Sequence, residues 1–247
     1  MAKIIKVCGL KTADAAYTAI ENGANLLGVI LVPNRARTVD PQQAIEISKL
    51  CRAKRISNGS RFVDSRDLLN YMRNIDEVGP EWFEISVNQV TENGPFLVGV
   101  FRNQPLEDVI KASKELNLDF VQLHGSENVD DYSSQLDIPV ISRFVLNKPG
   151  IENALMTHKF IIPLLDSEVG GEGKLIDWDD ASSFGDKMKG RYILAGGLTP
   201  ENVDQALNVS GCCGVDVSGG VETEGVKDLG KVKAFVVNAK NTCKQVD

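Results

Sequence analysis

Short runs of apolar, often β-branched residues alternate along this chain with longer stretches in which apolar positions recur at helical spacing. This alternation is typical of repeated strand–helix units, whose parallel sheet is buried on both faces. The apolar runs predict eight strands, over residues 4–8, 26–31, 96–101, 120–123, 140–144, 160–165, 192–195 and 214–217.

Helix signals fill the gaps between these runs. Residues 12–22 begin with a Thr/Asp pair suited to N-terminal capping, and Gly23 is placed to end the helix. The last helix is expected over 226–240. Three prolines stand near expected helix starts, where a missing N–H costs nothing: Pro41, Pro105 and Pro200.

The alternation of strand and helix patterns is interrupted between the second predicted helix and the third predicted strand. Residues 57–94 are rich in Asn, Gly, Ser, Asp and charged residues, with scattered aromatics, and we interpret them as an insertion. Helical spacing of Leu68, Leu69, Met72 and Ile75 predicts one helix over 65–74. The rest is expected to be a tolerated surface loop, which we favour over a partner-binding segment.

The length of the chain indicates which architecture this pattern of strands and helices forms. The chain has 247 residues, 43% of them apolar, which is the usual size of a single (β/α)₈ TIM barrel and too small for two ordinary domains. We therefore predict an α/β fold in which residues 1–247 form one barrel domain.

Composition excludes several classes of protein. A formal net charge of −7 argues against nucleic-acid binding, and the cluster of Arg52, Lys54 and Arg55 is interpreted as a solvated helix end. No stretch approaches the ~18 apolar residues of a membrane span, and the N-terminus lacks a secretory signal, so we expect a cytoplasmic protein. Five dispersed cysteines and two histidines suggest neither a disulfide framework nor a zinc site.

Two glycine-rich segments near the end of the chain carry the first functional signal. Residues 194–202 and 214–222 each follow an apolar run and open into a helical pattern. Glycine lets the backbone approach an anion, and free N–H groups at a helix start supply the binding field. Two such loops at the last two strand-to-helix turns are typical of the phosphate site of a TIM barrel.

The carboxyl ends of the strands carry the second signal, because a barrel places its catalytic groups there. Cys8 ends the first strand, Asp166 follows the sixth, and the fourth gives Gln122 and His124. A thiol as base and a carboxylic acid as proton donor suit the isomerisation of a sugar phosphate. The alternatives are a packed cysteine and an aspartate that caps a helix or forms a salt bridge in its loop, and His124 leaves a cysteine nucleophile open.

An arginine pair lies after the second strand. Arg35 and Arg37 belong to a loop in which a guanidinium can hold a substrate carboxylate through two hydrogen bonds. We expect one of the two to do so and the other to be a solvated surface residue.

Seven segments together carry a family signal: residues 6–10, 121–125, 164–167, 194–198 and 214–222, with 98–103 and 32–38. The first five, taken in order, resemble the phosphoribosylanthranilate isomerases of tryptophan biosynthesis, and the last two resemble their fungal branch. The chain departs from the usual pattern in its longer 57–94 segment and in Gly219-Gly220 where Ser-Gly is commoner.

The resemblance implies a cofactor-free Amadori rearrangement of phosphoribosylanthranilate by a monomer. It implies that Cys8 is the base and Asp166 the acid, whose pKa burial against Leu164 and Leu165 must raise. Arg37 is implied on the anthranilate carboxylate, and His124 either lines the pocket near the aromatic ring or is a structural loop residue. Asp216 either bonds sugar hydroxyls or braces its loop. The implied phosphate ligands are Gly197, Ser218, Gly219 and Gly220.

Three other functions stay open at this stage. An aminoaldose isomerase of histidine biosynthesis performs the same rearrangement, but resembles a barrel with aspartates at both the first and the sixth strand, where this chain has Cys8 and Asp166. A non-catalytic barrel that binds a phosphometabolite needs neither a thiol nor an acid. A cysteine hydrolase predicts a covalent intermediate, which the isomerase mechanism lacks.

Overall fold

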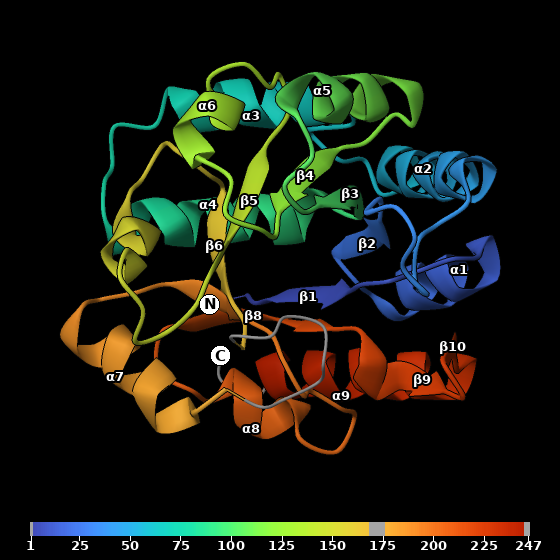
Figure 1. Ribbon diagram of the computed structural model, residues 1–247. Coiled ribbons are helices and arrows are strands. Elements are labelled where there is room, and N and C mark those ends of the chain that lie inside the picture. Colours follow the sequence, from blue (N-terminus) through green and yellow to red (C-terminus); the bar gives the residue numbers. More distant parts are fainter. Residues whose placement is uncertain (1, 168–175, 245–247) are drawn as a thin grey trace.

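The computed structural model describes residues 2–167 and 176–244 and shows a closed barrel of eight parallel strands. Figure 1 looks into this barrel and shows most of the helices in a ring around it. The fold class predicted from the alternating pattern is therefore confirmed. The strands are β1 (Ile4–Val7), β2 (Leu26–Ile30), β3 (Phe96–Phe101), β4 (Phe120–Leu123), β5 (Val140–Phe144), β6 (Ile162–Leu165), β7 (Tyr192–Leu194) and β8 (Cys212–Val217).

The barrel closes where its first strand meets its last. Lys6 of β1 pairs in register with Asp216 of β8, and the Cys8 N–H donates to the Val217 carbonyl at 2.8 Å. Each predicted strand is found, but the ends differ by a few residues. β6 starts at Ile162 instead of residue 160, although Phe160 and Ile161 are buried, and β8 begins two residues earlier than expected.

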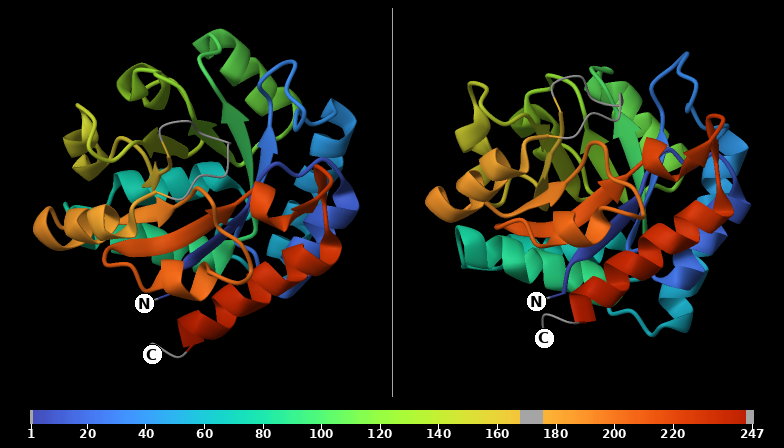
Figure 2. Two further views of the ribbon diagram at one scale, coloured as in Figure 1. Left: turned by 60° about the horizontal axis from the view of Figure 1, so that its bottom comes forward. Right: turned by 90° about the horizontal axis from the view of Figure 1, so that it is seen from below.

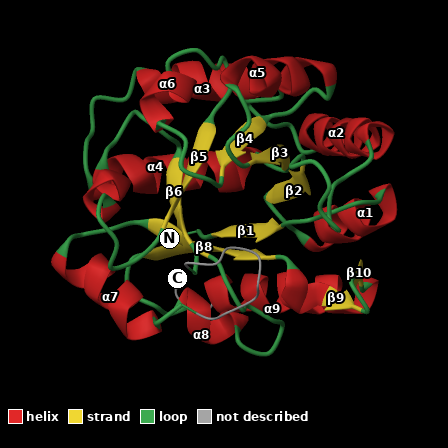
Figure 3. Cartoon of the chain, viewed as in Figure 1, coloured by secondary structure: helices red, strands yellow, loops and turns green. Residues whose placement is uncertain are grey.

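Capping explains where the helices begin and end. The Thr12 side chain accepts a hydrogen bond from the Ala15 N–H, and Gly23 ends α1 in a left-handed conformation with φ of 109°. Figure 3 shows the helices between successive strands. They are α1 (Ala13–Asn22), α2 (Pro41–Ser57), α5 (Leu106–Glu115), α6 (Val129–Ser133), α7 (Trp178–Lys187), α8 (Val203–Leu207) and α9 (Leu229–Lys244), with 3₁₀ helices η1 (Ile151–Leu155) and η2 (Gly219–Val221).

The last helix starts later than the sequence predicted. Val226–Lys227 forms a short strand, β10, which pairs antiparallel with β9 (Glu222–Thr223). Because Glu224 and Gly225 between them both have positive φ, the chain turns back here before α9 begins at Leu229. This hairpin follows β8 and lies at the end of the barrel where the strands finish.

The expectation of a surface loop within 57–94 is wrong. The segment forms α3 (Ser65–Arg73), close to the helix predicted over 65–74, and a second helix, α4 (Pro80–Asn93). Trp82 and Phe83 of α4 are buried at 2% and 1% exposure. The Ser86 hydroxyl donates to the Ile161 carbonyl, just before β6, at 2.6 Å. Helix α4 therefore covers the end of the barrel where the strands begin, as the right-hand view of Figure 2 shows.

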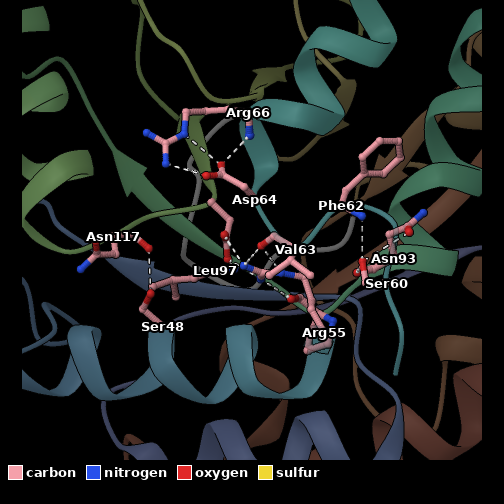
Figure 4. Close-up of polar contacts among 12 residues, drawn as sticks. Ser48, Arg55, Ser60, Phe62, Val63, Asp64, Arg66, Asn93, Leu97 and Asn117 are labelled. Atoms are coloured by element: carbon pink, nitrogen blue, oxygen red, sulfur yellow. Dashed lines mark hydrogen bonds and ion pairs between the residues drawn. The ribbon is translucent and has the colours of Figure 1, made fainter. Parts of the chain in front are cut away.

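A buried ion pair fixes the chain between α2 and α3. Arg55 is 2% exposed and binds both carboxylate oxygens of Asp119 at 2.7 Å. It also donates to the carbonyls of Val63 and Pro95 (Figure 4). Arg55 is thus not part of a solvated helix end, because its guanidinium binds three separate segments in the interior. Among the residues described, no helix is long and apolar enough to cross a membrane.

Candidate active site

A pocket of about 470 Å³ opens where the barrel strands end, at the opposite end from α4. Residues from strands and loops far apart in the sequence line it, since the carboxyl ends of all eight strands converge there. The nine residues that the sequence singled out all lie in its wall: Cys8, Arg37, His124, Asp166, Gly197, Asp216, Ser218, Gly219 and Gly220.

Cys8 follows β1 directly and is 6% exposed. Its side chain occupies space that Gly28 of β2 leaves open, because a Cβ atom at Gly28 would lie 2.6 Å from the Cys8 Sγ. Burial raises the pKa of the Cys8 thiol above its ordinary value, and the positive charges of Lys6 and Lys227 oppose this. The thiol is thus pre-positioned, and nearby cations favour its thiolate form.

A buried ion pair lies beneath the pocket. The Lys6 ammonium is fully buried and stands 2.9 Å from the Asp216 Oδ2. Burial disfavours the charge of Lys6, but the charges of Asp216 and Cys8 hold its pKa above the ordinary value. The second oxygen of Asp216, Oδ1, is buried without a hydrogen-bond partner among the described residues. Asp216 therefore braces Lys6 with one oxygen and keeps the other as an acceptor at the pocket wall.

Asp166 follows β6 and is 5% exposed. Its Oδ1 accepts from the Ser167 N–H at 2.8 Å, and its Oδ2 lies 3.3 Å from the His124 Nε2 and 3.7 Å from the Arg143 Nε. Burial disfavours the carboxylate, but these neighbours together hold the pKa of Asp166 below its ordinary value. The expectation that burial against Leu164 and Leu165 raises this pKa is therefore wrong.

Arg37 belongs to a charged cluster at the pocket rim. Its guanidinium donates two hydrogen bonds of 2.8 Å to Glu222, whose carboxylate also accepts from the Lys227 Nζ at 2.7 Å. Although burial opposes it, hydrogen bonding to Arg37 and Lys227 keeps the pKa of Glu222 below its usual range. The β9–β10 hairpin supplies Glu222 and Lys227, and so holds Arg37 against the pocket.

The two glycine loops meet on one side of the pocket. Gly196 and Gly197 have φ of 88° and 65°, a conformation that side chains disfavour. A Cβ at Gly220 would lie 1.8 Å from the Leu198 carbonyl oxygen, so the two loops approach this closely only because Gly220 has none. Within the described part of the chain, the N–H groups of Gly197, Gly219 and Gly220 donate no hydrogen bond. The Ser218 Oγ is buried there without a partner.

The sequence missed three residues that shape this site. The sequence does not mark Lys6 as a site residue, because a lysine on an apolar strand resembles a residue at a sheet edge. However, side chains two residues apart on a strand face the same side, so Lys6 and Cys8 share a face. The sequence pattern places Lys227 in the final helix, and it marks Gln122 as a strand-end residue without indicating a role. In the described residues, no three His, Cys, Asp or Glu are grouped so as to hold a metal ion.

Comparisons with known proteins agree with this geometry. The sequence profile of the family described as N-(5'phosphoribosyl)anthranilate (PRA) isomerase matches residues 48–238. The N-(5'-phosphoribosyl)anthranilate isomerase of Komagataella pastoris is 49% identical over 238 residues, which cover 96% of this chain and 99% of that protein.

Solved structures are similar over nearly the whole chain. The crystal structure of phosphoribosyl anthranilate isomerase from Thermus thermophilus is 26% identical with a TM-score of 0.69, and the match covers 96% of this chain and 98% of that one. A further structure shows the isomerase in complex with reduced 1-(o-carboxyphenylamino)-1-deoxyribulose 5-phosphate. It is 27% identical with a TM-score of 0.66, over 98% of this chain and 100% of that one.

Proposed function

The chain belongs to the family of N-(5'-phosphoribosyl)anthranilate isomerases, and we propose that it rearranges its substrate with Cys8 as the base and Asp166 as the acid. Its activity is the isomerisation of phosphoribosylanthranilate in tryptophan biosynthesis. The observation that carries the proposed roles is the shared pocket, in which a buried thiol, a buried carboxyl group and two glycine loops face one space.

Two proton transfers open the sugar ring and form the enolamine. Asp166 gives a proton to the furanose ring oxygen, the bond between C1 and that oxygen breaks, and the nitrogen lone pair forms a C1=N Schiff base. The Cys8 thiolate removes the proton on C2, and the electron pair forms an enolamine while the nitrogen becomes neutral. Tautomerisation places a proton on C1 and converts the C2 hydroxyl to the ketone. Each transfer is ordinary general acid–base catalysis.

Binding of the anthranilate carboxylate is assigned to Arg37. A guanidinium has five N–H donors, and the two bonds to Glu222 leave three for a ligand. The same two bonds fix the plane of the guanidinium, so little freedom is lost when the carboxylate binds.

The phosphate is assigned to the glycine loops. The N–H groups of Gly197, Gly219 and Gly220 and the hydroxyl of Ser218 have no partner among the described residues, and they are suitable donors for phosphate oxygens. Asp216 has a free acceptor oxygen for a sugar hydroxyl. His124 lines the pocket and lies against Asp166, which favours a role beside the acid.

We also propose that the enzyme acts in the cytoplasm as a monomer and without a cofactor. The described cysteines are all free thiols, which is usual in a reducing compartment. Light scattering on the purified protein tests the monomer, for which the chain mass is 26.9 kDa. A dimer mass would overturn this part of the proposal and leave the chemistry unaffected.

Turnover tests the function directly. Protein dialysed against a chelator is mixed with freshly generated phosphoribosylanthranilate, and the loss of anthranilate fluorescence is followed against spontaneous hydrolysis. We expect rapid loss and a product that carries the rearranged ketose by ¹³C NMR. Binding without turnover would support a phosphometabolite-binding barrel instead. Turnover of only the histidine-pathway aminoaldose, or a covalent adduct on Cys8, would favour the other two alternatives.

A further inference from the structure

Resting on the proposed role of Asp166, we propose that Gln122 is a positioning residue, which orients this acid by fixing the tautomer of His124. Gln122 and Asp166 both line the pocket, and β5 lies between β4, which carries Gln122, and β6, which Asp166 follows. The chain of contacts runs from the Gln122 amide through the imidazole to the carboxyl group.

The first contact determines where the imidazole carries its hydrogen. Gln122 on β4 and His124 just after it are two residues apart, so both side chains face the barrel interior. The Gln122 Nε2 lies 3.0 Å from the His124 Nδ1. An amide NH₂ can only donate, so Nδ1 accepts and the hydrogen of the neutral ring is on Nε2.

The second contact transmits this choice to the acid. The His124 Nε2 lies 3.3 Å from the Asp166 Oδ2, while the Ser167 N–H holds the other oxygen at 2.8 Å. The Nε2–H tautomer therefore donates to Oδ2, and both carboxyl oxygens have a donor. The opposite tautomer would turn a lone pair toward Oδ2 and leave Arg143, 3.7 Å away, as the side chain that holds this oxygen.

The Gln122 amide is buried, and its contact with the His124 Nδ1 is the hydrogen bond described for it. The side chain is 1% exposed, and its carbonyl oxygen Oε1 is buried without a partner in the described structure. A flipped amide would instead turn its oxygen toward Nδ1 and accept from a ring that carries its hydrogen there. The two orientations thus predict opposite tautomers, which can be measured.

The experiment is ¹⁵N NMR of the imidazole rings in the ligand-free protein. The chain has only two histidines, so the variant His158→Asn assigns both sets of signals. His158 packs at an angle against Trp82 of α4, with ring centroids 5.1 Å apart, away from the pocket. We expect the neutral form of His124 to carry its hydrogen on Nε2, and Gln122→Met to give a mixture of tautomers. A wild-type ring with the hydrogen on Nδ1, or a tautomer unmoved in Gln122→Met, would overturn the proposal.

Kinetics supply the second readout. We expect Gln122→Met to lower kcat by up to about 100-fold through misplacement of the acid, with a smaller effect on KM. The control is Gln89→Met on α4, at the other end of the barrel, which should keep wild-type kcat. Equal kcat in the two variants contradicts the positioning role. The imidazole spectrum does not depend on turnover, so a protein with the expected tautomer but no isomerase activity would refute the proposed function alone.

Discussion

At the scale of single residues, the reactivity of Cys8 depends on a missing side chain on the neighbouring strand. A Cβ at Gly28 would lie 2.6 Å from the Cys8 Sγ and 3.0 Å from its Cβ. The substitution Gly28→Ala must therefore displace the thiol. We predict a loss of kcat of about 100-fold, because small misplacements of a catalytic group are costly, at a stability cost of about 1–3 kcal/mol.

A matched control separates the effect of a crowded strand from the effect of a displaced Cys8 thiol. Gly99 lies on β3, where an added Cβ would lie 2.4 Å from the Leu118 Cδ1 instead of a pocket residue. Gly99→Ala should thus lose similar stability in urea unfolding and keep most of its kcat. Wild-type kcat in Gly28→Ala would show that the position of the thiol does not limit the reaction.

The pH dependence of the rate follows from two pKa shifts in opposite directions. Burial raises the pKa of Cys8, while the neighbours of Asp166 lower its pKa despite burial. The proposed roles require a thiolate at Cys8 and a carboxylic acid at Asp166, which is the minor pair of charge states in the free enzyme. Its fraction stays constant between the two pKa values, falls below the lower one as Cys8 and Asp166 are both protonated, and falls above the higher one as both are deprotonated.

We therefore predict that kcat/KM, which reports the free enzyme, is flat across neutral pH. It should fall only below the ordinary aspartate value of about 3.9 and above the ordinary thiol value of about 8.5. Initial rates across this range, with circular dichroism to confirm folding at each pH, make the measurement. A narrow bell with both limbs between about pH 6 and 8 would contradict the assignment of the two groups.

At the scale of elements, α4 is a structural component of the barrel. Phe83 is 1% exposed and packs on Phe160 with ring centroids 6.0 Å apart. We predict that Phe83→Ala lowers the free energy of unfolding by about 3–5 kcal/mol. The folded enzyme should keep its kcat, because α4 and the pocket lie at opposite ends of the barrel.

Urea unfolding and initial rates on the same samples check this prediction. The control is Tyr17→Ala on α1, since Tyr17 is 55% exposed and its truncation should cost little. A Phe83→Ala protein as stable as this control would mean that α4 does not support the barrel.

At the scale of the whole molecule, the sequence predicted best those features of the fold that impose a local pattern of apolar residues. Buried parallel strands require continuous apolar runs, so eight runs predicted eight strands, and the convergence of strand ends predicted which residues share a pocket. Helix α4 was not predicted, because its apolar residues are interspersed with Asn, Gln and Glu and follow an irregular polar segment.

Electrostatics could not be predicted because they depend on contacts between distant segments. Arg37 and Glu222 are 185 residues apart, and the groups that lower the pKa of Asp166 come from the residue after β4, from β5 and from its own loop. The sequence showed the apolar neighbours of Asp166 and so predicted a raised pKa. The structure adds the donors that reverse the direction.

We propose that Cys8 and Asp166 perform the two proton transfers in one pocket. The most direct measurement is single-turnover conversion of phosphoribosylanthranilate by wild type, Cys8→Ser and Asp166→Asn, with the affinity of each for the reduced product analogue. We predict that both variants bind the analogue as wild type does and convert substrate about 10²–10⁴-fold more slowly. A variant that binds normally and reacts at the wild-type rate would contradict the account.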